Sequence, residues 1–257
     1  MQGLVTLAVV AFVGRALARN WDQFRSLHVT LTIGPGWIAG SVLLVFLTYV
    51  MQVESWRRIL AGWGQRLTFR AAARVWSLAN LGRYVPGKVW SVAGLVVLAQ
   101  QAGVEAGPAA ASAFVLQAIS LGTGAAVVAA VAPGSAPPLR LAAAGLAAVL
   151  TITVLSWGTY GAAFWMLTRG LVPDTPLPLT AAIGAFTLGY ILGVLALFAP
   201  GGVGVRELVL IGLLAPFLGS GGAVAVSVAS RLLLTVLEAT AALVTLPLRH
   251  RPQESLN

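Results

Sequence analysis

The stretch Leu81-Gly-Arg-Tyr-Val-Pro-Gly-Lys-Val-Trp90 governs the fold, because it sets a Pro86-Gly87 pair between two long apolar segments. Proline removes a backbone donor and glycine relaxes the backbone, so a helix ends at this pair. Arg83 and Lys88 flank it, and Lys88 is the only lysine in the chain. In a bilayer, a broken helix is tolerated only where protein or enclosed water satisfies its free backbone groups. The stretch therefore predicts a break inside the membrane, against a polar part of the protein.

A second stretch, Leu197-Phe-Ala-Pro-Gly-Gly-Val-Gly-Val-Arg-Glu207, repeats this pattern after a shift of 114 positions. The shift aligns Leu78, Tyr84, Pro86, Gly87 and Val89 with Leu192, Phe198, Pro200, Gly201 and Val203. The second break runs from Pro200 through Gly201 and Gly202 to Gly204. Interrupted apolar segments at matching places in two halves of a chain point to a transport site between them.

The composition indicates an all-α polytopic membrane protein. Of the 257 residues, 58% are hydrophobic and 9% are charged, and the mean hydropathy is +0.91. A soluble domain carries about 25% charged residues. The apolar runs are long and unbroken, whereas a transmembrane β-barrel shows short alternating segments.

The net charge of +9 does not indicate a nucleic-acid partner, because the arginines lie at the ends of apolar runs, as the positive-inside rule requires. The chain has no cysteine, which excludes disulfides and thiolate metal sites. Its two histidines, His28 and His250, are predicted in a loop and in the tail. No nucleotide-binding or hydrolase motif is present, so we expect neither an enzyme nor an ATP-driven pump, and no cofactor.

We expect one transmembrane domain, 1–257, with seven or eight membrane-embedded helical segments. Its first half, 1–132, is broken at 86–87, and its second half, 139–248, is broken at 200–204. The expected segments are 3–18 (a retained anchor), 36–54, the two arms of 69–101, 109–132, 139–169, 179–199 continuing over 205–218, and 222–247. Each arm of 69–101 has about 16 residues, roughly 24 Å, which is short of a full crossing. Each break therefore predicts a re-entrant helix hairpin.

Residues 139–169 decide the topology. At about 46 Å of helix they are too long for one straight span and short for two, with Trp157-Gly158 as a candidate break. Crossing twice makes the halves an inverted repeat and leaves the tail inside, whereas crossing once puts Arg249 and Arg251 outside, against the charge rule. We favour the inverted repeat.

The segment from Arg57 to Lys88 holds seven basic residues and no acid, which places it on the cytoplasmic side. Two spans precede it, so the N-terminus is expected to be cytoplasmic as well. We expect a bacterial-type inner membrane protein with both termini cytoplasmic.

Three cations are candidates for binding a lipid headgroup: Arg83, Lys88 and Arg206. Helix ends at a break present free N–H groups to an anion, and arginine binds phosphate bidentately. The simpler alternative is positive-inside flanking for Arg83 and Lys88. For Arg206 it is a self-neutralising pair with Glu207, where the functional hypothesis has Glu207 hold Arg206 in place.

Arg231 and Glu238 lie seven residues apart in the last apolar segment, on one helix face. They form either an internal ion pair or, with Tyr84 and Glu207, the polar lining of a cavity. Glu54 is expected to pair with Arg57 or Arg58, and Gln117 to hydrogen-bond between helices.

Four motifs in order carry a family resemblance: Glu54-Ser-Trp-Arg-Arg-Ile-Leu60, Asn80-Leu-Gly-Arg-Tyr-Val-Pro-Gly-Lys-Val89, Pro200-Gly-Gly-Val-Gly-Val-Arg-Glu207, and Ser230-Arg-Leu-Leu-Leu-Thr235 with Glu238. They resemble the transmembrane domain of lysylphosphatidylglycerol synthases and the flippase-like proteins related to it. The resemblance implies a helical domain that moves lipids between leaflets. In the full-length relatives a cytoplasmic synthase domain makes the aminoacylated lipid; we expect this chain to be a stand-alone form without it.

The expected function is to bind an anionic or aminoacylated phospholipid, or a polyprenyl-linked lipid, and to translocate it between leaflets. Membrane phospholipids are then its partners, and the oligomeric state is open. The alternatives are a non-transporting scaffold for a separate lipid synthase or glycosyltransferase, and a small-solute transporter.

The position of the tail gives a first prediction. A single cysteine introduced as Arg249→Cys in this cysteine-free chain is expected to resist a membrane-impermeant thiol reagent in intact cells and to react after permeabilisation. Labelling in intact cells would place the tail outside and contradict the predicted orientation.

Overall fold

The computed structural model describes residues 33–84, 89–131, 144–196, 199 and 202–248, and every regular element in these ranges is a helix. The elements are α2 (Pro35–Gly62), α3 (Phe69–Asn80), the 3₁₀ turn η1 (Leu81–Tyr84), α4 (Val89–Gln101), α5 (Ala106–Val131), α6 (Ala144–Leu171), α7 (Leu179–Leu195) and α8 (Val205–Thr245). Four of them, α2, α5, α6 and α8, are long and apolar enough to cross a membrane. The chain is a multi-pass helical membrane protein, as the composition predicted.

Most predicted segments have a counterpart in the structure. The span over 36–54 is α2, the arms of 69–101 are α3 and α4, the span over 109–132 is α5, and 179–199 contains α7. The expected first helix, 3–18, lies outside the described residues. So do Pro86, Gly87 and Lys88 of the first break, and Pro200 and Gly201 of the second.

The predicted double crossing of 139–169 is wrong. Residues 144–171 form the single helix α6, and Trp157 and Gly158 lie inside it. The Trp157 indole donates to the Ser120 carbonyl of α5 at 3.2 Å and meets the Tyr190 ring of α7 edge-on at 5.3 Å. Its contacts thus join α6 to two neighbouring helices. Without the double crossing, the expected cytoplasmic tail depends on the charge rule alone.

The predicted division of the last segment is present as a kink in α8. Gly219 has φ 68° and ψ 165°, outside the helical region, and Pro216 lies one turn before it. Proline removes one helical hydrogen bond, and glycine adopts a positive φ without the steric cost that a side chain adds. The kink divides α8 into a short first arm and a longer second arm.

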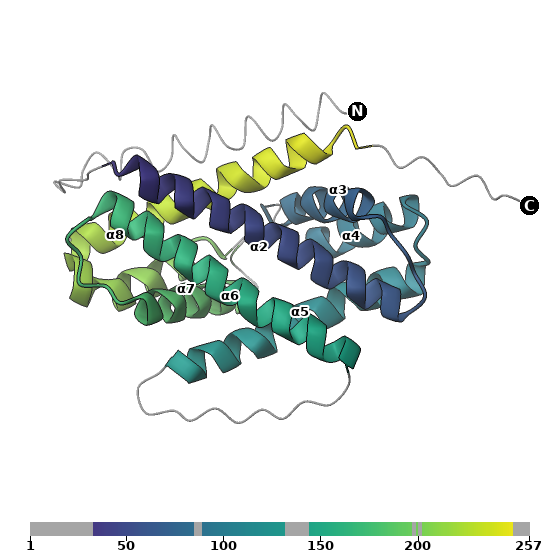
Figure 1. The fold of residues 1–257 in the computed structure, drawn as a ribbon, viewed down its shortest axis with the longest axis horizontal. Helices are drawn as coiled ribbons and strands as arrows, with labels where there is room; N and C mark the ends of the chain where they lie inside the picture. Colours follow the sequence, from purple (N-terminus) through teal and green to yellow (C-terminus); the bar gives the residue numbers. More distant parts are fainter. Residues whose placement is uncertain (1–32, 85–88, 132–143, 197–198, 200–201, 249–257) are drawn as a thin grey trace, which may run out of the picture.

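Helices α2 and α6 pack side by side in opposite directions through the middle of the molecule (Figure 1). The Gly34 N–H donates to the Gly170 carbonyl at 2.9 Å, and the Ser41 hydroxyl donates to the Ala163 carbonyl at 2.7 Å. Further along α2, Thr48 bonds Thr159 at 2.7 Å, through their hydroxyls. Short polar side chains of this kind hold membrane helices together at close approach.

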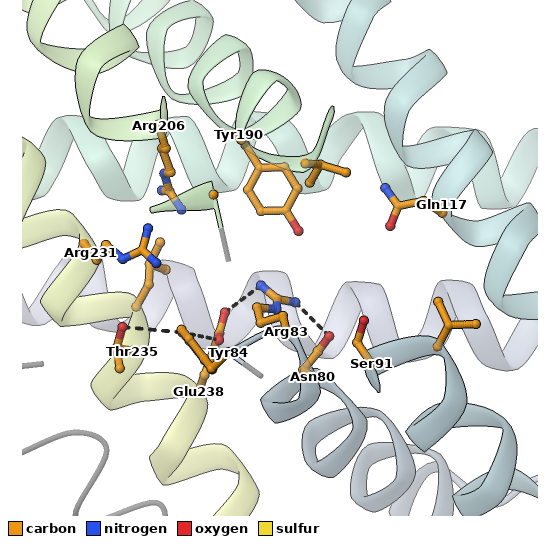
Figure 2. Close-up of a pocket in the computed structure, with 15 residues that line it drawn as sticks. Asn80, Arg83, Tyr84, Ser91, Gln117, Tyr190, Arg206, Arg231, Thr235 and Glu238 are labelled. Atoms are coloured by element: carbon orange, nitrogen blue, oxygen red, sulfur yellow. Dashed lines mark hydrogen bonds and ion pairs between the residues drawn. The ribbon is translucent and has the colours of Figure 1, made fainter. Parts of the chain in front are cut away.

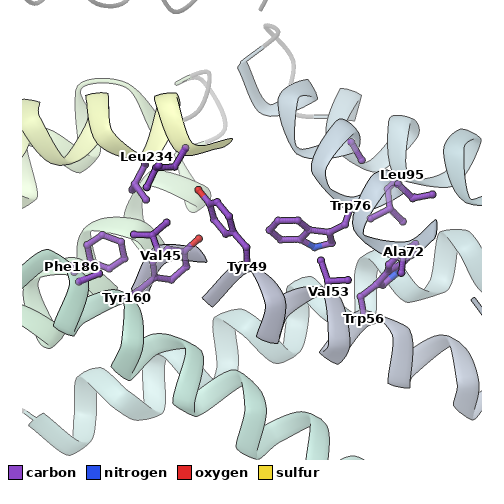
Figure 3. Packing of buried hydrophobic residues seen from close by; sticks show 14 of the residues in the cluster. Val45, Tyr49, Val53, Trp56, Ala72, Trp76, Leu95, Tyr160, Phe186 and Leu234 are labelled. Carbon is purple, nitrogen blue, oxygen red and sulfur yellow. The ribbon is translucent and has the colours of Figure 1, made fainter. Parts of the chain in front are cut away.

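A buried aromatic cluster ties α3 and α7 to the pair of α2 and α6 (Figure 3). Tyr49 of α2 lies 5.8 Å from Trp76 of α3 and 6.3 Å from Tyr160 of α6, measured between ring centroids. Tyr160 in turn stacks on Phe186 of α7 at 5.3 Å. The cluster thereby fixes α3 and α7, the first arms of the two broken segments, to the same central pair.

Two glycines one turn apart in α6 test this packing. A Cβ added at Gly161 would lie 2.5 Å from the Ile183 Cα of α7, whereas one added at Gly158 would meet nothing within 4 Å. Gly161→Ala should therefore destabilise the protein by about 1–3 kcal/mol. Gly158→Ala should stabilise it by roughly 0.5–1 kcal/mol through helix propensity. Thermal unfolding in detergent measures both, and equal effects would contradict the packing of α6 on α7.

Candidate functional site

A polar cavity of about 280 Å³ lies where η1, α4, α5, α7 and α8 meet (Figure 2). Its walls come from both broken segments and from the second arm of α8. The polar and charged residues that line it are Asn80, Arg83, Tyr84, Ser91, Gln117, Tyr190, Arg206, Arg231, Thr235 and Glu238. Five of the polar residues singled out from the sequence are thus brought to one place: Arg83, Tyr84, Arg206, Arg231 and Glu238.

The first hairpin, which consists of α3, η1 and α4, closes tightly at Gly82. A Cβ there would lie 2.7 Å from the Ser91 nitrogen of α4, so only glycine allows η1 to approach the start of α4 this closely. The close turn carries Arg83 and Tyr84 to the cavity, where they face α8 (Figure 2).

The second hairpin, which consists of α7 and the first arm of α8, closes on a pair of glycines. Gly202, at φ 71°, lies against Gly193 of α7, and a Cβ on Gly202 would be 2.9 Å from the Gly193 Cα. Gly204, at φ 85°, precedes α8, and its N–H donates to the Glu207 carboxylate at 2.6 Å. The Gly189-xxx-Gly193 spacing, too common in this chain to be informative as sequence, marks the face of α7 on which the break packs.

Arg83 has a partner on each of its two terminal nitrogens. Its Nη1 donates to Glu238 Oε1 at 2.9 Å and its Nη2 to Asn80 Oδ1 at 2.7 Å. The Tyr84 hydroxyl donates to the other Glu238 oxygen at 2.7 Å. Only 6% of the Glu238 side chain is exposed. An ion pair therefore joins the first hairpin to α8.

Arg231 is paired with the second hairpin, through a 2.9 Å contact from its Nη1 to Glu207 Oε1. The internal Arg231–Glu238 pair predicted from the sequence is therefore wrong. Both residues face the same cavity, as their spacing indicated, but each is bound by a residue from a different hairpin.

Arg206 is the exception in this network. Its Nε and Nη2 atoms are buried without a hydrogen-bond partner, and it forms no ion pair with any residue that the structure describes. Its guanidinium lies over the Phe186 ring at 4.6 Å and near the Tyr190 ring at 5.8 Å. The expected role of Glu207 is also corrected, because Glu207 holds Arg231 and not Arg206.

This arrangement is suited to an oxyanion. The aromatic rings of α7 fix the plane of the Arg206 guanidinium, and its free N–H groups offer the fork that carboxylate or phosphate oxygens accept. The two Arg–Glu pairs cancel in charge, so among the described residues around the cavity Arg206 is left with an uncompensated positive charge. Binding roles for Arg83, Lys88 and Arg206 nevertheless stay predictions.

Sequence reasoning missed Asn80, Ser91, Tyr190 and Thr235. A polar group inside an apolar span is the available signal, and Tyr190 in α7 carries it. Gln117, expected to bond between helices, instead lines the cavity from α5 (Figure 2). Glu54 pairs with Arg57 at 2.7 Å and Arg58 at 2.8 Å, away from the cavity, and the local cluster predicted there is confirmed.

Residues 134–241 match the family model of the lysylphosphatidylglycerol synthase TM region. The matched region includes α6, α7 and most of α8, hence Arg206, Glu207, Arg231 and Glu238. No curated protein matches the chain.

The Arg83–Glu238 pair gives a prediction. Glu238→Gln leaves a largely buried guanidinium without its counter-charge and should cost on the order of 3 kcal/mol of stability, while Arg83→Gln/Glu238→Gln should recover part of the loss. Glu54→Gln, which breaks the more exposed pair at the end of α2, should cost about 1 kcal/mol or less. Unfolding midpoints in detergent measure these effects, and additive losses in the double variant would contradict the pair.

Proposed function

We propose that this chain, whose residues 134–241 match the family model of the lysylphosphatidylglycerol synthase TM region, binds the phosphate of a membrane lipid between its two hairpins and moves the headgroup between leaflets. The lipids it takes would be anionic or aminoacylated phospholipids or polyprenyl-linked lipids. It would act in a bacterial-type inner membrane, and membrane phospholipids would be its partners.

The observation that supports this proposal is the unpaired guanidinium of Arg206. A cation buried among membrane helices without a partner is unfavourable, and such residues mark substrate sites by default. Arg83 and Arg231 are each paired with a glutamate, whereas the Nε and Nη2 groups of Arg206 are charged hydrogen-bond donors without a partner among the described residues. A scaffold that carried no lipid would have no use for such a group.

The exterior of the described helices suits a lipid substrate. Leu43, Phe114, Leu208 and Val244, from four parts of the chain, are each about two-thirds exposed or more. In a chain of this hydropathy such side chains face acyl tails. A lipid whose tails stay in this apolar surround could keep its charged headgroup in the cavity, which is the division of contacts that transfer between leaflets needs.

The proposed architecture is an inverted repeat with two re-entrant hairpins. Helices α2 and α6 both have 28 residues and run in opposite directions; α2 is followed by the short helices α3 and α4, and α6 by the short helix α7 and the short first arm of the kinked α8. In both hairpins a glycine of the first arm, Gly82 or Gly193, lies against the backbone of the second. From the sequence, the inverted repeat depended on a double crossing by residues 139–169, which α6 does not make. The antiparallel arrangement of α2 and α6 now supports the repeat instead.

The ion pairs suggest how a headgroup would move. Glu238 holds the first hairpin through Arg83, and Glu207 of the second hairpin holds Arg231. A phosphate that enters at Arg206 would compete with Glu238 for Arg83 and with Glu207 for Arg231. Its arrival would weaken the contacts that join the two hairpins to the second arm of α8. Either hairpin could then move against that arm while the phosphate stays neutralised.

Reconstituted vesicles test the proposal. Wild-type protein should speed the exchange of fluorescent phospholipid between leaflets, measured by dithionite quenching. Arg206→Gln should reduce the rate at least about tenfold, since charge-assisted hydrogen bonds to an ion are each worth roughly 1.5–3 kcal/mol. Arg206→Lys should recover only part of it, because lysine lacks the fork.

Arg58→Gln, at the end of α2 and away from the cavity, is the matched control and should retain the wild-type rate. Exchange no faster than in protein-free vesicles, or equal rates for wild type and Arg206→Gln, would contradict the proposal.

A further inference from the structure

Tyr190 of α7 has a ring whose orientation is fixed by neighbouring helices. It meets the Trp157 indole of α6 edge-on, with 5.3 Å between ring centroids, and its centroid lies 5.8 Å from the Arg206 guanidinium of α8. The Trp157 indole is itself held by α5, because its nitrogen donates to the Thr123 hydroxyl at 3.3 Å. The direction in which Tyr190 presents its hydroxyl is therefore set by packing.

The Tyr190 hydroxyl has no partner in the part of the protein that the structure describes. It points into the cavity of about 280 Å³ (Figure 2) and forms no hydrogen bond with any described residue. The hydroxyl of Tyr84, in contrast, donates to Glu238 at 2.7 Å in the same cavity. A phenol hydroxyl in an apolar surround usually finds a hydrogen-bond partner. A partner of Tyr190 would therefore lie in the cavity.

The contact with Arg206 does not account for this hydroxyl. Phe186, one turn earlier in α7, lies closer to the same guanidinium, at 4.6 Å, and has no hydroxyl. The faces of phenylalanine and tyrosine attract a cation by the same electrostatic interaction. Phe186 is 2% exposed and does not line the cavity, whereas Tyr190 does. Of the two rings beside Arg206, the one that carries a hydroxyl is thus the one that faces the open space.

The charges around the cavity select the kind of group that this hydroxyl would bond. A phenol hydroxyl can donate or accept. A cationic ligand that donated to it would lie near the uncompensated charge of Arg206, which is unfavourable. An oxyanion can accept from both Tyr190 and the partnerless Nε and Nη2 groups of Arg206, and hydrogen bonds to a charged acceptor are the strong ones. The arrangement therefore favours a ligand that accepts.

We infer that the Tyr190 hydroxyl donates a hydrogen bond to the oxyanion bound by Arg206. Tyr190 then has two separable parts: its ring orients the Arg206 guanidinium, and its hydroxyl binds the phosphate. The inference rests on the proposed function and adds an uncharged donor to the site. It applies to any ligand that presents a phosphate, whatever the remainder of the ligand.

Retention of phosphatidylglycerol by the protein in detergent, measured by native mass spectrometry, tests the inference. Tyr190→Phe keeps the ring and removes only the hydroxyl, so it should lower retention about tenfold, the loss expected for one hydrogen bond to a charged group. Diacylglycerol, which has no phosphate, should be retained equally by wild type and Tyr190→Phe. Tyr190→Leu also removes the ring, and its retention of phosphatidylglycerol should fall about twofold to fivefold further.

Tyr49→Phe is the matched control. The Tyr49 hydroxyl is also without a partner among the described residues, but it is buried and Tyr49 does not line the cavity. This variant should retain phosphatidylglycerol as wild type does. Tyr190→Phe should unfold in detergent at the wild-type midpoint, because no described residue loses a hydrogen bond. Lower retention at an unchanged midpoint is then a loss of binding and not of folding.

Inorganic phosphate separates the two sources of the oxyanion. Weak competition with phosphatidylglycerol assigns the site to a lipid phosphate, and full competition assigns it to a soluble phosphate. In either case the inference requires that Tyr190→Phe weaken the species that binds.

The outcomes are distinguishable. Equal retention of phosphatidylglycerol by wild type and Tyr190→Phe, together with a loss in Arg206→Gln, overturns the inference and leaves the proposed function standing. An equal loss of phosphatidylglycerol and diacylglycerol in Tyr190→Phe also overturns it, because the hydroxyl would then not act on the phosphate. Retention of no phosphatidylglycerol by wild type contradicts the proposed function and the inference together.

Discussion

The pairing of charges across α8 is the constraint on which the site depends. Charged side chains among membrane helices are unfavourable unless they are paired or face water. The second arm of α8 carries Arg231 and Glu238 on one face, and their partners are Glu207 in the first arm of α8 and Arg83 in η1. Each hairpin is thereby bound to the second arm of α8 by one ion pair. Two segments far apart in sequence are held around one cavity by the need to neutralise four charges.

The same pairing makes Arg206 distinctive. Among the described charged residues around the cavity, Arg83 cancels Glu238 and Arg231 cancels Glu207. The Arg206 guanidinium lies against the Phe186 and Tyr190 rings, and two of its nitrogen atoms are buried without a hydrogen-bond partner. The glycine contact between α7 and the second break holds Arg206 there, since a side chain on Gly202 would lie 2.9 Å from the Gly193 Cα and push the start of α8 away. The backbone geometry of the break and the availability of the cation are therefore linked.

The sequence predicted most of the described helices, because apolar length acts locally, whereas both Pro-Gly pairs lie outside the described residues. It failed where the answer depended on neighbours in space. Residues 144–171 form one helix, with Trp157 and Gly158 inside it, since α6 is held along its length by an antiparallel α2. The spacing of Arg231 and Glu238 predicted their common face correctly but not their partners, because the kink in α8 brings Glu207 to Arg231 and the turn η1 brings Arg83 to Glu238. Tyr190 was missed because it belongs to no charged motif, and Asn80 because its place in the motif with Arg83 did not show that its side chain accepts a hydrogen bond from Arg83 at the cavity.

The position of a lipid phosphate in the bound protein tests the central claim most directly. An experimental structure determined in a lipid nanodisc containing anionic phospholipid would show it. The account predicts phosphate density within hydrogen-bond distance of Arg206 Nε and Nη2, with the Arg83–Glu238 contact beside it. A cavity filled by acyl chains, or an Arg206 paired with a carboxylate of the protein and no phosphate nearby, would contradict it.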